Sequence, residues 1–159
     1  IGLASRVTEE LKNGDYLAEA WLELGNAYRG QKKPAQAMEA FGRSNTLSTG
    51  ETGARAGFLV GEVLFEQKKF KDAIRQYKLV IYGYGGARAP DAIRKWQCSS
   101  GYETARCYHV QIKGEKNPQA RGKLVEDATK FYTYVVKNHP QDRLAAESGK
   151  QLAILEKLK

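Results

Sequence analysis

Apolar side chains recur along this chain at intervals of three and four residues, and short polar stretches interrupt them. In the segment 20–44, the positions that keep this spacing are Trp21, Leu24 and Tyr28, and then Ala37, Ala40, Phe41 and Ser44. Such spacing places residues on one face of a helix. The polar stretch "GQKK" separates the two groups, and Pro34 follows it, where a proline starts a helix without losing a hydrogen bond. The pattern predicts a helix, a tight turn and a second helix.

The same pattern returns 36 residues later. The segments 20–41 and 56–77 align without a gap, so that Gly25 matches Gly61. The other matches are Gln31-Lys32-Lys33 with Gln67-Lys68-Lys69, Ala37 with Ala73, and Phe41 with Tyr77. A fixed period of this length is typical of stacked helical repeats. We therefore expect an all-α chain that forms an α-solenoid of antiparallel helix pairs.

The first unit resembles the tetratricopeptide repeat, whose pattern is W-x2-L-G-x2-Y followed by A-x3-F. The matching residues are Trp21, Leu24, Gly25, Tyr28, Ala37 and Phe41. The second unit keeps Gly61, Leu64, Ala73 and Tyr77, and has Gly57 in place of the tryptophan. Small residues suit the places where two helices approach closely, and the rings fill the seams. The resemblance implies a right-handed superhelix whose concave face, made mainly by the first helix of each pair, binds a protein or peptide without catalysis.

A third, looser copy follows. It is carried by Ala105 in the small-residue place, Tyr108 in the place of Tyr28, and then Ala128, Tyr132 and a closing Pro140. Ala105 and Ala128 are 23 residues apart, whereas Gly25 and Ala37 are 12 apart. About eleven extra residues must therefore lengthen either the turn or its flanking helices.

One array is expected over residues 1–159. Its parts are the end of a truncated preceding repeat (1–16), three repeats (18–51, 54–87 and 90–142) and a capping helix (143–159). The connection 83–90 is rich in glycine, but no strand leads into it and no Gly-Lys-Ser/Thr ending follows. We therefore predict a joint between two repeats rather than a phosphate-binding loop. Whether this joint or the segment 111–123 also contacts a partner stays open.

Composition adds a preference for acidic partners. The 159 residues are 42% hydrophobic and 28% charged, as in a soluble globular domain, and the formal net charge is +8. No apolar run approaches the roughly 20 residues that span a bilayer. Cys98 and Cys107 would lie on roughly opposite sides of one helix, too far apart for a disulfide, so we expect two free thiols.

The motifs of strong catalytic sites are missing. The sequence has no G-x4-G-K-[ST], no HExxH and no G-x-S-x-G, and His109 and His139 are isolated. We therefore expect neither an enzyme nor a bound metal or cofactor, and interpret His139 as a helix-end residue.

The candidate partner-binding groove follows from the repeat pattern. The expected inner positions are Glu19, Leu22, Asn26 and Arg29; Arg55, Phe58, Glu62 and Phe65; and Ser99, Tyr102, Arg106 and His109. Aromatic rings there would bury apolar side chains of a peptide, and guanidinium groups would pair with its carboxylates. The alternative for Phe58 and Phe65 is that they pack against neighbouring helices.

Other interpretations remain open. A basic repeat surface is compatible with single-stranded RNA, although Asn26, Glu62 and Arg106 do not resemble a base-reading code. The chain is also compatible with self-association or with a purely structural segment of a larger repeat protein. Only Asn26 matches the carboxylate clamp of co-chaperones. The second and last repeats look more like envelope-associated bacterial members, such as the Tol-Pal coordinator and outer-membrane assembly lipoproteins, which favours the cell envelope over the cytoplasm.

Overall fold

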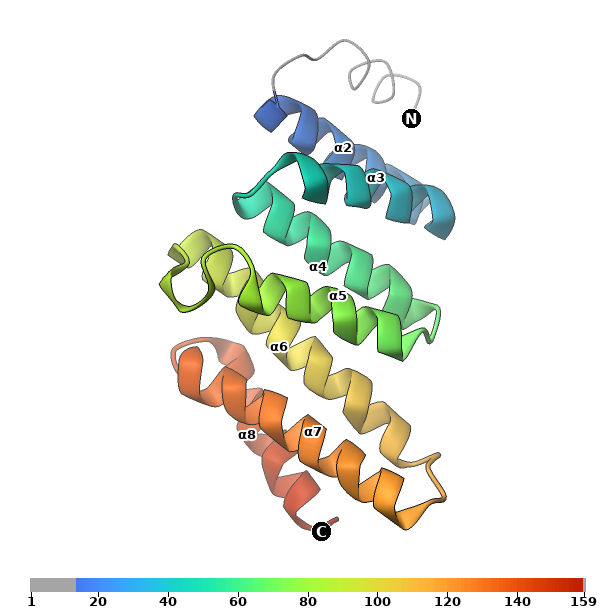
Figure 1. Ribbon diagram of the computed structural model, residues 1–159, viewed down its shortest axis with the longest axis vertical. Coiled ribbons are helices and arrows are strands. Elements are labelled where there is room, and N and C mark those ends of the chain that lie inside the picture. The colour runs from blue at the N-terminus through green and yellow to red at the C-terminus, as the bar shows by residue number, and fades with distance from the viewer. Residues whose placement is uncertain (1–13, 159) are drawn as a thin grey trace.

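The computed structural model describes residues 14–158, and these form seven α-helices, one short 3₁₀ helix and no strand (Figure 1). The elements are α2 (Gly14–Gly30), α3 (Pro34–Leu47), α4 (Glu51–Glu66), α5 (Phe70–Tyr82), η1 (Gly86–Arg88), α6 (Asp91–Ile112), α7 (Pro118–Asn138) and α8 (Arg143–Glu156). The predicted all-α helical repeat is confirmed. The truncated repeat expected in residues 1–16 lies almost entirely outside the described residues.

The helices stack in chain order along the long axis of the molecule (Figure 1). The first helices of the pairs, α2, α4 and α6, contact one another in sequence, and α6 also contacts α8. Within the described residues, the backbones of the second helices α3, α5 and α7 do not approach one another in this way, and α5 meets α7 through side chains such as Lys78 and Phe131. The first helices are therefore the closely packed inner row, and the second helices spread apart on the outer side.

Two edges flank these rows. The turns within the pairs, residues 31–33, 67–69 and 113–117, lie on the right in Figure 1 and form what we call the turn edge. The connections between pairs, residues 48–50, 83–90 and 139–142, lie on the left and form the joint edge. Each edge therefore presents three short segments at the spacing of the repeats.

Prolines and left-handed residues shape the turn edge. Pro34 and Pro118 occupy the first turns of α3 and α7, as the sequence predicts for Pro34. Lys32 and Lys68 adopt φ angles of 58° and 59°, a left-handed conformation that costs energy for a residue with a Cβ atom. The equal angles at equivalent positions indicate that the two turns share one backbone form.

Close approaches of glycine to aromatic rings join the helices of a pair. A Cβ atom on Gly25 would overlap the ring of Phe41, and one on Gly61 would overlap the ring of Tyr77. Both rings are fully buried. A third approach, which the sequence pattern missed, occurs at Gly101, where a Cβ atom would lie 2.7 Å from the ring of Tyr134.

The third pair is longer because its helices are longer. α6 has 22 residues and α7 has 21, whereas α4 has 16 and α5 has 13. The turn between α6 and α7 is only residues 113–117. Ala105, Ala128 and Tyr132 are buried in one cluster, as expected for the third copy of the pattern. The extra residues therefore extend both helices beyond this shared core.

Side-chain hydrogen bonds from α3 and α6 hold the glycine-rich segment 83–90 in place. α5 ends at Tyr82, Gly85 has a φ angle of 91°, and the side-chain amide of Gln97 donates to the carbonyl oxygens of Gly83 and Gly86. Asn45 of α3 donates to the hydroxyl oxygen of Tyr84. These bonds hold the segment against helices of two repeats.

Cys98 and Cys107 are free and buried, as predicted. Burial raises the pKa of each thiol to about 12, so both remain protonated and pack as small apolar groups.

Candidate functional site

The inner row carries one polar residue at the same place in each pair. These residues are Asn26 in α2, Glu62 in α4 and Arg106 in α6. All three are half-buried and already bonded within the chain. Asn26 donates to Glu23 at 3.3 Å, Glu62 accepts from the hydroxyl of Tyr77 at 3.0 Å, and Arg106 donates to Glu103 at 2.7 Å.

Arg29 links the first two repeats across the inner row. Its guanidinium group pairs with Glu66 and lies 3.6 Å from a carboxylate oxygen of Glu62. Burial opposes the charge of Arg29, but the hydrogen bond and charge of Glu66 outweigh this and raise the pKa of Arg29. The arginine is therefore a contact between repeats as well as a surface group.

Glu103 and Arg106 form the corresponding pair in α6. The whole Glu103 residue is 8% exposed, and its Oε2 atom has no hydrogen-bond partner within the described residues. Burial raises the pKa of Glu103 to about 7; Arg106 opposes this shift, and Glu62 reinforces it. The guanidinium carbon of Arg106 lies 4.6 Å from the centre of the Phe65 ring, so Arg106 also joins α6 to α4.

The predicted aromatic groove residues are engaged by neighbouring helices. Phe58 lies 5.7 Å from Tyr77 and 5.5 Å from Trp96, measured between ring centres. Phe65 lies 5.5 Å from Phe70. Both residues are half-buried and pack against neighbouring helices, which was the alternative to their exposure in the groove.

The remaining predicted groove positions have different surroundings. Tyr102 packs edge-on against Tyr132 with ring centres 5.6 Å apart, and His109 Nδ1 lies 3.4 Å from the hydroxyl of the same tyrosine. Arg55 is half-buried, with its guanidinium carbon 5.9 Å from the centre of the Trp96 ring. Ser99 is half-buried, and Glu19 is exposed and accepts from the hydroxyl of Thr52 at 3.0 Å.

The expected exposure of Leu22 is wrong. This side chain is fully buried in a cluster with Ala37, Phe41, Ala56 and Val63. Because α4 packs directly against α2, the position one helical turn before Asn26 faces the next repeat rather than the groove.

The structure thus brings Arg29, Glu62, Phe65 and Arg106 together at the centre of the inner row. Sequence reasoning missed two carboxylates that pair with these arginines, Glu66 and Glu103. Glu103 was recognisable, because it stands three residues before Arg106, a spacing at which side chains on a helix meet. Glu66 lies 37 residues from Arg29, and no local spacing indicates that contact.

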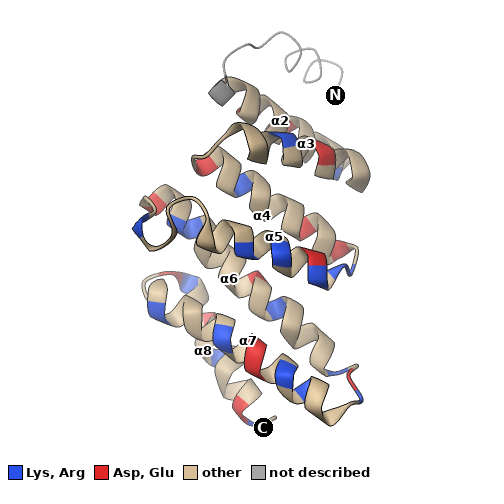
Figure 2. Ribbon diagram, in the orientation of Figure 1, with Lys and Arg blue, Asp and Glu red and all other residues tan. Residues whose placement is uncertain are grey.

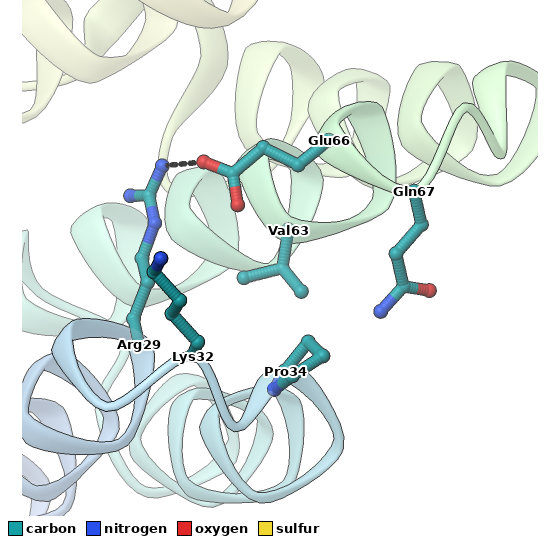
Figure 3. A pocket seen from close by; sticks show the side chains of 6 residues that line it. All are labelled: Arg29, Lys32, Pro34, Val63, Glu66 and Gln67. Carbon is teal, nitrogen blue, oxygen red and sulfur yellow. Dashed lines mark hydrogen bonds and ion pairs between the residues drawn. The ribbon is translucent and has the colours of Figure 1, made fainter.

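A hollow of about 290 Å³ opens where the inner row meets the turn edge (Figure 3). We call it the first hollow; its lining residues are Arg29, Lys32, Pro34, Val63, Glu66 and Gln67. Figure 3 shows the Val63 side chain pointing into this space, with the Arg29–Glu66 pair on one side. The hollow has an apolar floor and a charged rim.

The described residues provide no evident metal or membrane site. Within residues 14–158, no cluster of three or more His, Cys, Asp or Glu side chains is placed to hold a metal ion. In the same part of the chain, no helix combines the length and the hydropathy needed to cross a membrane.

The stacked helix pairs and their glycine–aromatic contacts define an all-α helical-repeat scaffold that resembles the tetratricopeptide type. Residues 19–44 match the family model described as Tetratricopeptide repeat. This is the segment in which the sequence pattern is complete. A comparison with curated proteins found no match.

Proposed function

We propose that this chain is a protein-interaction module that binds a segment of a partner protein across the inner row of α2, α4 and α6, without catalysis. The observation that carries the proposal is the recurrence of half-exposed polar groups, one set per first helix, on a scaffold that matches the tetratricopeptide repeat. Such modules bind through side chains that a rigid array holds at fixed spacing.

The internal ion pairs define what the partner must provide. Arg29 and Arg106 already have carboxylate partners, so a ligand gains most from their remaining donors and from the exposed parts of Arg55 and Tyr102. A mixed polar segment with hydrogen-bond acceptors suits this surface better than a strongly acidic one. The same pairs disfavour the RNA alternative, because Glu62 and Arg106 are occupied by protein groups.

A peptide-display selection on the immobilised chain tests the proposal. The expected result is a consensus sequence whose binding is weakened at least tenfold by Arg29→Gln with Arg55→Gln. The matched control is Arg75→Gln with Lys130→Gln, which removes two exposed cations from the outer helices α5 and α7. Selected peptides that bind the groove variant and the control equally well would contradict the assignment. Thermal denaturation of both variants establishes that they remain folded.

A further inference from the structure

The turn edge carries a row of cations that nothing in the described chain neutralises. They are Lys32 and Lys33 in the first pair, Lys68 and Lys69 in the second, and Lys113 and Lys116 in the third, and Lys71 and Arg121 follow them at the starts of α5 and α7. All are exposed, and none forms an ion pair with another described residue. The inner row differs, because Arg29 and Arg106 are paired there.

Net charge is concentrated on this edge. The three turns of the turn edge hold six lysines and one glutamate, a net charge of +5, out of +8 for the chain. The three connections of the joint edge hold one arginine and one aspartate, a net charge of zero with histidine neutral. Figure 2 shows the basic residues at the turns between α4 and α5 and between α6 and α7. The molecule therefore presents an uncompensated positive field along one side.

Two hollows, each with apolar surface in its walls, lie between these cations at equivalent places in the array. The first hollow lies between the turn after α2 and the end of α4 (Figure 3). A second hollow, of about 430 Å³, lies between the turn after α6 and the residues that follow α8; it mixes polar and apolar walls, and its lining residues are Glu115, Lys116, Pro118, Arg121, Gly122, Val125 and Leu158. Pro34 and Pro118 occupy the same place in their pairs. In the second pair this place holds Phe70, which packs on Phe65.

We propose that the turn edge is a second docking surface, which binds an acidic protein segment carrying bulky apolar side chains. Carboxylates of such a segment would pair with the exposed lysines, and its apolar side chains would enter the hollows, each of which is large enough for one or two side chains. The surface adjoins the inner row at Arg29, which lines the first hollow, but its lysines and its second hollow lie outside the groove, so the proposal stands even if the groove binds nothing.

The hollows favour a protein segment over other polyanions. Phosphate groups of a nucleic acid or of lipid headgroups would be attracted to the lysines but would leave the apolar parts of the two hollows unfilled. Single-stranded nucleic acid also requires exposed rings for stacking. The most exposed aromatic residues described, Tyr16 and Tyr82, stand at the start of α2 and the end of α5, on the joint edge.

Fluorescence anisotropy with a labelled probe tests the charge requirement on the full 159-residue chain. The probe is an 18-residue peptide of Glu with Leu or Phe at every third position. We expect Lys33→Glu, Lys69→Glu and Lys116→Glu together to weaken its binding at least tenfold. The control, Arg88→Glu with Lys137→Glu and Arg143→Glu, changes the net charge equally away from the turn edge and should weaken binding less than threefold. Equal losses in the two variants would overturn the proposal.

A second comparison tests the hollows. Gly122 lines the second hollow, and a Cβ atom there would meet nothing within 4 Å, so Gly122→Phe should fill the hollow while improving helix propensity. We expect at least fivefold weaker binding of the probe. Gly149→Phe in α8, where a Cβ atom is equally unobstructed, is the matched control and should leave binding unchanged.

The chemical class of the partner is decided with three further probes: the same peptide with Ser replacing Leu and Phe, a 20-base-pair DNA duplex, and vesicles containing phosphatidylserine. The proposal expects the apolar peptide to bind at least fivefold more tightly than the Ser peptide at 150 mM salt, and more tightly than the duplex or the vesicles. A Ser peptide that binds equally well, or tighter binding of the duplex or vesicles, would overturn it. The two proposals are separated by Arg55→Gln alone, which leaves the Arg29 wall of the first hollow intact: it should weaken binding of the display consensus while the acidic probe still binds.

Discussion

The inner row and the turn edge both repeat cations along the array, yet the two sets are placed in opposite ways. Arg29 and Arg106 lie between helices of successive repeats and are paired with carboxylates of the same chain. The lysines of the turn edge stand at the tips of turns, exposed and unpaired among the described residues. Basic residues therefore link successive repeats in the inner row, whereas on the turn edge they leave positive charge exposed to solvent.

This difference teaches that exposure predicted from a repeat pattern does not identify a binding cation. A guanidinium group that is already paired with a carboxylate of its own chain attracts an acidic ligand less strongly than an unpaired ammonium group does. The contrast also predicts where substitutions change stability, since removing a paired cation leaves a carboxylate behind whereas removing an unpaired one leaves nothing. Four variants, from the largest effect to the smallest, test this contrast.

Arg106→Leu should have the largest effect. At pH 8 it leaves the buried Glu103 carboxyl without its partner, so this group either keeps an unpaired charge or takes up a proton, and we expect the free energy of unfolding to fall by about 2 kcal/mol, measured by urea denaturation. This value allows for the partial exposure of Arg106. Lys69→Ala on the turn edge should change the free energy by less than about 0.5 kcal/mol. Equal losses for both variants would remove the distinction between the two regions.

Glu103→Gln should change the pH dependence of stability. The pKa of Glu103 in the folded chain, about 7, is above its usual value of 4.5. The folded state therefore holds the proton more tightly, and the associated stability is complete below pH 4.5 and is lost as pH rises through 7. Between pH 5 and pH 8 the wild type should lose on the order of 2 kcal/mol more than Glu103→Gln.

The comparison with Glu103→Gln also separates this carboxyl from the histidines. Burial lowers the pKa of His109 and of His139, so their contribution changes with pH in the opposite direction. Both histidines are present in wild type and variant, and their contribution cancels in the difference. Parallel stability curves for the two proteins would show that Glu103 ionises normally.

Tyr77→Phe should cost about 1 kcal/mol, because it removes the hydroxyl that donates to Glu62 at 3.0 Å from a fully buried ring. The measurement is the free energy of unfolding of Tyr77→Phe, Glu62→Gln and the double variant. If the hydroxyl acts through Glu62, the double variant should cost less than the sum of the single variants. Strict additivity would indicate that the bond does not contribute.

Lys68→Gly should have the smallest effect, and a favourable one. It removes a cation from the turn edge and relieves a left-handed backbone with a φ angle of 59°, so we expect a gain of about 0.5 kcal/mol and a higher melting temperature. Lys69→Gly is the control, because its φ angle of −83° suits any residue. A loss of stability at Lys68 would show that its side chain contributes to the fold.

The sequence predicted most of what depends on local period. The 36-residue offset, the small residue at Gly25 and the proline at the start of α3 identify the first two helix pairs, because each is a short-range requirement of a helix or a helix pair. The sequence also predicted that the third pair is longer than the others, and its helices are longer. The location of the extra residues was not determined, because Ala105 and Ala128 are 23 residues apart whether those residues lie in the turn or in the helices.

The candidate site was less predictable because it depends on contacts between repeats. Leu22 occupies a position that the pattern assigns to the groove, and only the packing of α4 on α2 shows that it is buried. The pairing of Arg29 with Glu66 joins residues of different repeats. The groove residues therefore remain a prediction about ligands, although their positions are now described.

The side-chain contacts between outer helices have a mechanical consequence. The backbones of α3, α5 and α7 do not approach one another closely, but Lys78 Nζ of α5 lies 5.1 Å from the centre of the Phe131 ring of α7, and Ile81 of α5 belongs to the same buried cluster as Phe131. Bending the array would therefore disturb these outer contacts as well as the contacts along the inner row. Each hollow has walls from successive units, so curvature sets its width. A ligand on the inner row that changes the curvature of the array would therefore change the width of the hollows on the turn edge, and so the binding of a second ligand there.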